Sequence, residues 1–350
     1  MFDALLWRWV PLAAALLLNG CSTLDYYSHL AGGQLHLLQA REPIAELLEN
    51  PTADPELKQR LALAQQARDF ASAQLSLPDN DSYRLYADIQ RPFVVWNVFA
   101  TPEFSLSPEL HCFPIAGCVA YRGFYSQERA RGAAALLKQQ GLDTYLGGVE
   151  AYSTLGWFDD PILNTMLRWS DERLVAVIFH ELAHQQLYVA NDTAFNESFA
   201  SFVEREGLSQ WRIKQGLPPN DPQGEQQREQ FIALVLASRT RLQQLYASDL
   251  PPAQMRSGKQ AEIARLRAEY HALSKREWGG NGRYDDWINA PINNAKLLPF
   301  GLYDQWVPAF AALFEQVERD WPRFYQRVAA LGELPERERH QALMDLSAGS

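Results

Sequence analysis

Apolar residues recur along most of this chain with the spacing of amphipathic helices. Residues 26–77 follow this pattern over two or more helices, and Asp54-Pro55 supplies an N-cap and a first-turn proline for one of them. Two further apolar stripes lie within residues 208–277, on either side of Leu250-Pro251-Pro252. Because prolines at that point interrupt a helix, the pattern predicts a long antiparallel helical hairpin.

The C-terminal part carries one more apolar repeat. Phe310, Leu313, Val317 and Trp321 have helical spacing and predict a final amphipathic helix. Residues 334–350 have the composition of a polar tail.

Strand-forming runs are concentrated in residues 93–155. Residues 93–99 are β-branched and aromatic, and residues 145–156 combine strand formers with glycines. A helical pattern over residues 127–140 lies between these two runs. Together with the helical regions, this predicts an α+β fold that is mostly helical and contains a small sheet.

His180-Glu181-Leu182-Ala183-His184 is the most informative motif. It lies in an apolar helical pattern that begins after Ser170, a plausible N-cap. Two histidines four residues apart on a helix lie on one face, where both imidazoles can bind a single zinc ion. Glu181 lies beside them, as the general base of a metallopeptidase would. The pattern therefore predicts one Zn²⁺ per chain, with His180 and His184 as ligands.

The third ligand is expected on the next helix. No histidine follows His184 within a dozen residues, so the remaining ligand type is a carboxylate. Glu197 and Glu204 lie two turns apart on one face of a helix that Asn191-Asp192-Thr193 can cap. One of them would bind the metal and the other would hydrogen-bond a ligand.

Asn196-Glu197-Ser198-Phe199-Ala200 resembles the Asn-Glu-x-x-Ala signature of the gluzincin metallopeptidases. Most of the chain also resembles the predicted aminopeptidase family of bacterial lipoproteins, through segments at residues 151–161 and 293–297. The resemblance implies a zincin-like catalytic core and Glu197 as the third ligand. Ser201 stands where thermolysin-like enzymes have an aspartate, so their outer ligand shell cannot be transferred to this chain.

The chemistry that this site implies is peptide hydrolysis by an activated water, with Glu181 as general base. Tyr303 is the first candidate for the oxyanion donor, with Tyr284 and His271 as alternatives. We expect the peptide to lie along the strand at residues 145–156, where Gly148 permits close approach of backbone and Glu150 accepts a free amino terminus. The predicted function is a zinc aminopeptidase. The alternatives are an endopeptidase of envelope quality control and a non-catalytic periplasmic adaptor that retains a zinc site.

The N-terminus has the features of a targeting segment. Residues 1–20 contain a short apolar run and end before Cys21 in Leu18-Asn19-Gly20, which resembles a bacterial lipobox. We expect lipid on Cys21 to anchor the protein in the cell envelope, at the outer membrane facing the periplasm, with a plain secretory signal or a signal anchor as the alternatives. In that oxidising compartment Cys112 and Cys118 are expected to form a disulfide, with free thiols or a metal cluster with His111 as alternatives.

Charge and composition narrow the choice of partners. The net charge of −10 argues against nucleic acid and against electrostatic docking on an anionic membrane surface, so the expected partner is a peptide substrate. A hydrophobic fraction of 47% is enough for a substantial core. The hairpin at residues 208–277 is a structural appendage, a lid or an arm that binds a partner protein. The expected regions are a signal peptide (1–20), an N-terminal helical region (21–92), a catalytic core (93–207), the hairpin (208–277) and a C-terminal helical region (278–350).

Overall fold

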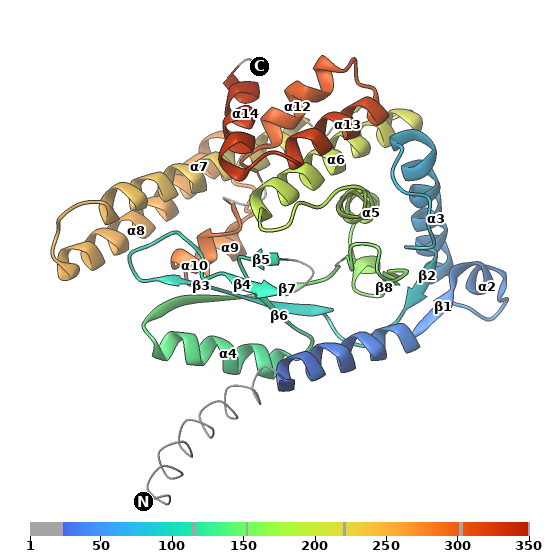
Figure 1. Ribbon diagram of the computed structural model, residues 1–350, viewed down its shortest axis with the longest axis horizontal. Coiled ribbons are helices and arrows are strands. Elements are labelled where there is room, and N and C mark those ends of the chain that lie inside the picture. Colours follow the sequence, from blue (N-terminus) through green and yellow to red (C-terminus); the bar gives the residue numbers. More distant parts are fainter. Residues whose placement is uncertain (1–23, 114–116, 152, 220–221, 301–303, 349–350) are drawn as a thin grey trace, which may run out of the picture.

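The computed structural model describes residues 24–113, 117–151, 153–219, 222–300 and 304–348. Helices dominate these residues, and their strands form small sheets, which confirms the α+β, mostly helical class (Figure 1). Among the described residues, no helix combines the length and apolar character needed to cross a bilayer.

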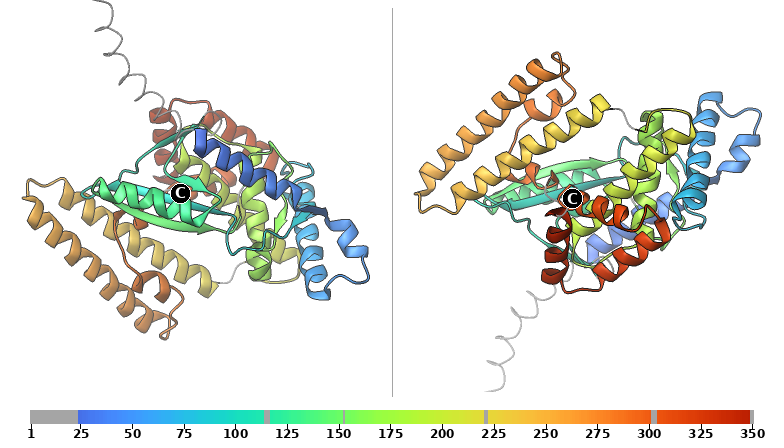
Figure 2. Two further views of the ribbon diagram at one scale, coloured as in Figure 1. Left: turned by 90° about the horizontal axis from the view of Figure 1, so that it is seen from below. Right: turned by 90° about the horizontal axis from the view of Figure 1, so that it is seen from above.

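A three-stranded antiparallel sheet lies between helix α4 (Gln127–Gln139) and the helices that carry the His-Glu and Asn-Glu motifs. Its order is β6 (Arg122–Phe124), β3 (Val95–Pro102) and β7 (Leu142–Val149). Helix α4 packs against one face, and the helices that carry the metal motif lie over the other (Figures 1 and 2).

Strand β7 ends at Val149, seven residues before the expected end at Gly156. The chain turns instead, with Leu155 and Gly156 at φ angles of 58° and 80°. Glycine adopts this left-handed conformation readily, whereas Leu155 must be held there by its surroundings. The residues beyond Val149 are therefore a shaped loop and not an edge strand.

Two antiparallel helices form the centre of the fold. Helix α5 (Asp171–Gln186) begins at Ser170, whose side chain accepts a hydrogen bond from the Arg173 amide, as the sequence predicts. Helix α6 (Thr193–Lys214) begins at Asp192, which caps it through the Phe195 amide. Together with α3 (Pro55–Leu75) they enclose the main hydrophobic core, in which Phe179 and Phe199 are fully buried. Burial of each such side chain contributes about 2 kcal/mol to folding.

The remaining N-terminal elements surround this core. Residues 24–39 form a helix, and Arg41 begins a second small sheet of order β1-β2-β8. The bounds of these elements and of the short hairpin that follows β3 are β1 (Arg41–Pro43), α2 (Ile44–Glu49), β2 (Leu85–Ala87), β4 (His111–Phe113), β5 (Gly117–Val119), β8 (Ile162–Leu163) and a 3₁₀ turn (Met166–Arg168).

The predicted hairpin is present as α7 (Pro222–Tyr246) and α8 (Pro252–Glu277), which extend away from the helical core (Figure 2). Helix α6 continues to Lys214, so the hairpin begins later than residue 208. The short helices α9 (Asp285–Asn289) and α10 (Asn294–Leu297) return the chain to the sheet.

The asparagine-rich segment before α10 joins the hairpin region to the sheet. Asn293 Nδ2 donates to the Thr144 carbonyl at 2.9 Å, and Asn294 Nδ2 donates to the Glu103 carbonyl at 2.9 Å. Because Thr144 belongs to β7, these amides satisfy polar backbone groups at the sheet edge. The segment has a structural role within the residues described.

The C-terminal region differs from the prediction. The single final helix is instead two helices, α12 (Val307–Gln316) and α13 (Trp321–Gly332). Asp320 caps α13, and Glu318 and Arg319 take positive φ angles in the turn before it. The apolar repeat conceals this break because both helices contribute to the same core. The expected polar tail contains α14 (Glu336–Ala348), with Leu343 fully buried.

Helix α14 braces the start of α6 through a buried ion pair. Arg339 Nε lies 2.9 Å from Asp192 Oδ2, and both side chains are almost wholly inaccessible to solvent. Arg339 also donates to the Gly332 and Leu334 carbonyls. The C-terminal helix thus supports the residue that caps the glutamate-bearing helix.

We predict that Arg339→Ala lowers the free energy of unfolding by about 3 kcal/mol, because it removes the buried guanidinium and leaves the Asp192 carboxylate only its contact with His340. Urea unfolding followed by circular dichroism measures the change. Arg337→Ala, an exposed position on the same helix, serves as the control and should change stability by less than about 0.5 kcal/mol. Equal stability of the two variants would contradict the bracing role.

Candidate metal centre and its cavity

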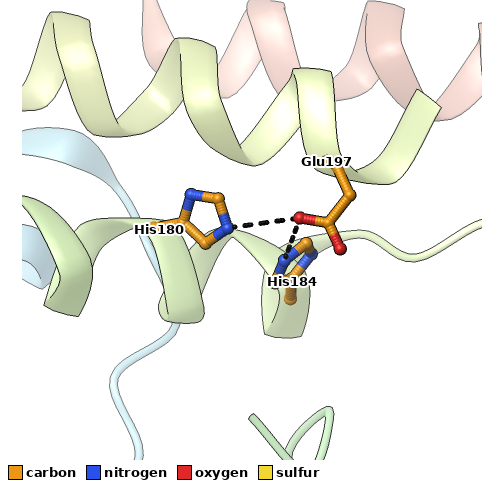
Figure 3. Close-up of side chains that lie close together, drawn as sticks. All are labelled: His180, His184 and Glu197. Atoms are coloured by element: carbon orange, nitrogen blue, oxygen red, sulfur yellow. Dashed lines mark ion pairs between the residues drawn. The ribbon is translucent and has the colours of Figure 1, made fainter. Parts of the chain in front are cut away.

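Two histidines and one glutamate converge between α5 and α6 (Figure 3). Glu197 Oε2 lies 3.5 Å from His180 Nε2 and 3.7 Å from His184 Nε2. One ligand atom of each residue lies within 4.8 Å of the others. The two imidazole planes are inclined by 84°, so their nitrogens approach one point from different directions. The group could hold a metal ion.

The turn between the helices sets this geometry. Asn196 Oδ1 accepts from the Val189 amide at 2.8 Å, and Asn196 Nδ2 donates to the Val189 carbonyl at 2.7 Å. These paired bonds attach the first turn of α6 to the segment that leaves α5. The next residue, Glu197, is thereby directed at the histidines. The asparagine of the Asn-Glu motif therefore positions the glutamate.

Glu204 orients His180 from the opposite side. Its Oε2 lies 2.9 Å from His180 Nδ1, so the second ring nitrogen, Nε2, faces Glu197. A carboxylate on the outer nitrogen fixes the tautomer and ring orientation of a metal-binding histidine. Of the two carboxylates that the sequence left open, Glu197 joins the candidate ligand group and Glu204 contacts His180.

The group has an excess of buried negative charge. The buried carboxylates of Glu181 and Glu197 lie beside two imidazoles, whereas Glu204 is 32% exposed and also lies near Arg173 and Arg205. Burial opposes protonation of His180, but the Glu197 and Glu204 carboxylates outweigh it and raise the His180 pKa well above its ordinary value. Burial likewise opposes ionisation of Glu197, but contact with the histidines lowers its pKa to about 2. Burial raises the pKa of Glu181. A divalent cation would neutralise this excess.

The donor set also fits a catalytic metal. Two imidazole nitrogens and one carboxylate are a ligand set of zinc hydrolases, and they leave a position open for water. His184 Nδ1 is buried and has no hydrogen-bond partner among the described residues. His184 therefore lacks the outer contact that Glu204 gives to His180.

A cavity of about 970 Å³ adjoins the metal group. His180, Glu181, His184 and Glu197 all line it. Its opposite wall consists of the sheet face at Val95 and Asn97, the helix at residues 24–39, and the loop that follows β7. The candidate ligands and the candidate base thus face a space large enough for a substrate.

The predicted substrate contacts lie at the margin of this cavity. Val149 and Ala151 line it, whereas Glu150 between them is not among the described lining residues. Glu150 Oε2 accepts a hydrogen bond from Trp169 Nε1 at 2.6 Å. A side chain at Gly148 would collide with the Phe93 ring, because an added Cβ would lie 2.5 Å from it. The roles of Glu150 and Gly148 in substrate binding stay predictions.

Five of the described tyrosines line the cavity, and the sequence predicts none of them there. Two of them, Tyr121 just before β6 and Tyr188 just after α5, lie near the Glu197 carboxylate of the candidate ligand group. Burial is the main reason that the pKa of Tyr121 is raised, and the Glu197 carboxylate adds to the effect. Both hydroxyls therefore keep their protons near neutral pH. The one indication in the sequence is that Tyr188 follows His184 by four residues.

The structure does not place any of the three candidates for the oxyanion donor among the described residues of the cavity lining. Tyr303 lies outside the described residues. Tyr284 stacks on Phe231 with a centroid distance of 3.9 Å, in the cluster beneath the hairpin. His271 is exposed on α8, next to the Tyr270 ring. Neither Tyr284 nor His271 is among the described residues that line the cavity.

The two downstream cysteines form a disulfide between β4 and β5, at directly opposed positions. This hairpin contacts the turn between the metal-motif helices, where Cys118 N donates to Asn191 Oδ1 at 2.8 Å. Phe113 and Val119 of the same hairpin line the cavity. Cys21, the predicted lipidation site, lies outside the described residues.

Asp160 fixes the loop that follows β7. Its Oδ2 accepts from the Thr154 amide at 2.8 Å and from Gln185 Nε2, next to His184, at 3.4 Å. Burial raises the pKa of Asp160 to about 6, although the hydrogen bonds from Thr154 oppose the shift. The carboxylate therefore connects the cavity wall to α5, and near neutral pH it is ionised at a cost to stability.

A family model described as "Putative aminopeptidase" matches residues 25–343. The match covers most of the chain, so the protein belongs to this family. No curated protein and no solved structure gave a significant match.

We predict that the protein becomes more stable, relative to Asp160→Asn, when the pH falls from 7 to 5. The Asp160 pKa in the folded state, about 6, lies above its ordinary value of 3.8, so the folded state takes up the proton first. The difference in unfolding free energy between the two proteins should shift by about 1 kcal/mol in favour of wild type. Urea titrations at both pH values measure it, and a constant difference would contradict the assignment.

Proposed function

We propose that this member of the aminopeptidase family is a zinc-dependent peptidase with a zincin-like core of gluzincin type. The supporting observation is the convergence of His180, His184 and Glu197 in a cavity that Glu181 also lines. The histidines come from one helix and the glutamate from an antiparallel neighbour. The family supports peptidase activity, and the metal and mechanism are our proposal.

His180, His184 and Glu197 would hold one zinc ion, and Glu204 would keep His180 in the binding tautomer. When bound, the ion would supply Lewis-acid activation of water and of the scissile carbonyl. The choice of zinc follows from the nitrogen-rich ligand set, since magnesium and calcium prefer ligands made of oxygen atoms alone.

Glu181 acts as the proton carrier. It is buried beside both histidines and lines the cavity. It takes a proton from the attacking water and delivers it to the amine that leaves. Its pKa is raised by burial, which makes the carboxylate a stronger base than one in water.

A hydrogen-bond donor is needed where the carbonyl oxygen gains negative charge. Tyr303 is our candidate from the sequence. Tyr121 and Tyr188 are further candidates, because each lines the cavity and keeps its hydroxyl proton. Substitution of each by phenylalanine would distinguish them.

An aminopeptidase is the primary proposal, because the family description names this activity. An endopeptidase is the second, and one observation favours it. Apart from Glu181 and Glu197, no carboxylate lines the described cavity, and the Glu150 carboxylate accepts from Trp169. A free substrate amino terminus thus has few anionic partners there. A non-catalytic adaptor, with the α7–α8 hairpin as its partner-binding arm, is the remaining alternative.

We also propose that residues 1–20 are a signal peptide and that lipid on Cys21 attaches the protein to the outer membrane, facing the periplasm. The support is the Leu18-Asn19-Gly20-Cys21 sequence. A disulfide at Cys112 and Cys118 is compatible with an oxidising compartment.

We predict that purified wild-type protein binds one zinc ion and that Glu197→Ala loses it, because two imidazoles alone leave the site incomplete. Glu181→Gln should keep the metal and lose turnover by a factor of about 10² to 10⁴. Atomic absorption measures the metal, and release of amino acids from free peptides measures turnover.

Glu206→Ala is the matched control for Glu197→Ala, since Glu206 is on the same helix but contacts Arg319. It should retain zinc. Unchanged zinc in Glu197→Ala would refute the ligand assignment, and full turnover by Glu181→Gln would refute the mechanism. Equal cleavage of free and amino-blocked peptides would replace the aminopeptidase proposal by the endopeptidase one.

We predict that Cys21→Ser removes the protein from the membrane fraction. The acylated cysteine supplies the apolar chains that insert into the bilayer, and each buried CH₂ contributes about 0.8 kcal/mol. Detergent-phase partition of whole-cell extracts measures the change. Membrane retention of Cys21→Ser at the wild-type level would contradict lipid anchoring at this residue.

A further inference from the structure

The described wall of the cavity carries almost no charge outside the metal group. Glu181 and Glu197 are the only carboxylates that line it, and no aspartate, lysine or arginine does. The other described lining side chains are mostly apolar or aromatic. A charged substrate side chain would lose its hydration in such a space without gaining an ionic partner. The cavity therefore favours uncharged, apolar groups.

Apolar side chains also stand exposed at the cavity. Leu35 and Phe158 are 54% and 46% exposed, and Trp157 is 66% exposed, yet all three line the cavity. They come from the helix at residues 24–39 and from the loop after β7. An apolar group that joins a hollow at the surface is typical of a binding site. The exposed residues thus extend the apolar wall outward.

The size of the cavity exceeds what one side chain needs. About 970 Å³ lies at the upper end of the range for sites that enclose a whole drug-sized molecule, roughly 300–1,000 Å³. Neutral polar side chains such as Asn97 and Thr193 are interspersed in the lining. They suit a peptide backbone, whose amides and carbonyls need partners when buried, whereas an acyl chain has no use for them.

We infer that the cavity binds a peptide segment that carries several large apolar side chains, and that such apolar segments are the substrate class of this site. The inference rests on the proposed peptidase function for its catalytic meaning. The walls that select the segment are the helix at residues 24–39, the Trp157 loop and the sheet face at Val95. The metal group at one side of the cavity then meets the bond to be cut.

Binding to the Glu181→Gln protein tests the inference without turnover. Two fluorescent peptides of equal length and charge are compared, one with four consecutive leucine or phenylalanine residues and one with serine and asparagine at those positions. Fluorescence anisotropy gives the Kd of each. We expect the apolar peptide to bind at least about tenfold more tightly, since burial of even one large apolar side chain is worth that factor.

Charged substitutions at the exposed part of the wall identify the binding surface. Leu35→Asp and Trp157→Asp should each weaken binding of the apolar peptide by about tenfold and leave the polar peptide unaffected. Leu136→Asp is the matched control, because Leu136 is a helical residue with 60% exposure that does not line the cavity. It should bind both peptides like the parent protein.

Equal affinity for the two peptides, or loss of binding in the Leu136→Asp control as large as in Leu35→Asp, would overturn the inference. Binding of dodecanoate but of neither peptide would assign the cavity to an acyl chain and overturn it as well. A protein that binds no zinc and cleaves nothing, yet prefers the apolar peptide, would refute the proposed function and leave the binding preference established. Cleavage of peptides by a protein that binds the apolar and the polar peptide equally would overturn the inference and leave the proposed function intact.

Discussion

The registration of α6 against α5 is the constraint on which this molecule depends. Glu197 reaches the two histidines only if its helix starts at the right point and runs antiparallel to theirs. The paired hydrogen bonds between Asn196 and Val189 fix that point. Asp192 caps the helix one turn earlier and is itself held by Arg339 and His340 of α14. A displacement of one residue would rotate Glu197 by about 100° away from the histidines.

Burial of the charged side chains is energetically unfavourable, and it also determines which ions and molecules the site can bind. The carboxylates of Glu181 and Glu197 and the two imidazoles have little access to water, and unpaired charge is unfavourable in such surroundings. The two ion contacts of His180 relieve part of that cost. The rest is an electrostatic preference for a cation, in a cavity whose other walls carry almost no charge among the described residues. The metal binding that we propose and the apolar substrate that we infer would thus both depend on the low polarity of the cavity.

Much of this site is predictable from local sequence. The four-residue spacing of His180 and His184 needs only the helical repeat, and Ser170 and Asp192 are ordinary caps. The choice between Glu197 and Glu204 needed the resemblance, because both lie on one helix face. In the structure, Glu197 contacts both histidines at Nε2, whereas Glu204 contacts His180 at Nδ1. The C-terminal helices were misjudged because the apolar repeat runs unbroken across the turn at Glu318, while the capping signal of Asp320 before Trp321 is short.

Local sequence patterns could not predict the cavity. Its wall combines the helix at residues 24–39, the loop held by Asp160 and two tyrosines, and these meet only through tertiary packing. The strand expected at residues 145–156 ended early for the same reason, since Asp160 draws the loop toward α5 through Gln185. Glycines and strand formers in that segment carry no sign of this long-range contact.

X-ray absorption at the zinc edge of the purified protein tests the central claim most directly. The account predicts two imidazole nitrogens at about 2.0–2.1 Å and a carboxylate oxygen at about 2.0–2.2 Å, without sulfur scattering. His184→Ala leaves only two of the three ligands, so the zinc-edge signal should be lost in that variant. A sulfur shell near 2.3 Å, or a spectrum without imidazole scattering, would contradict the assignment of the metal to His180, His184 and Glu197.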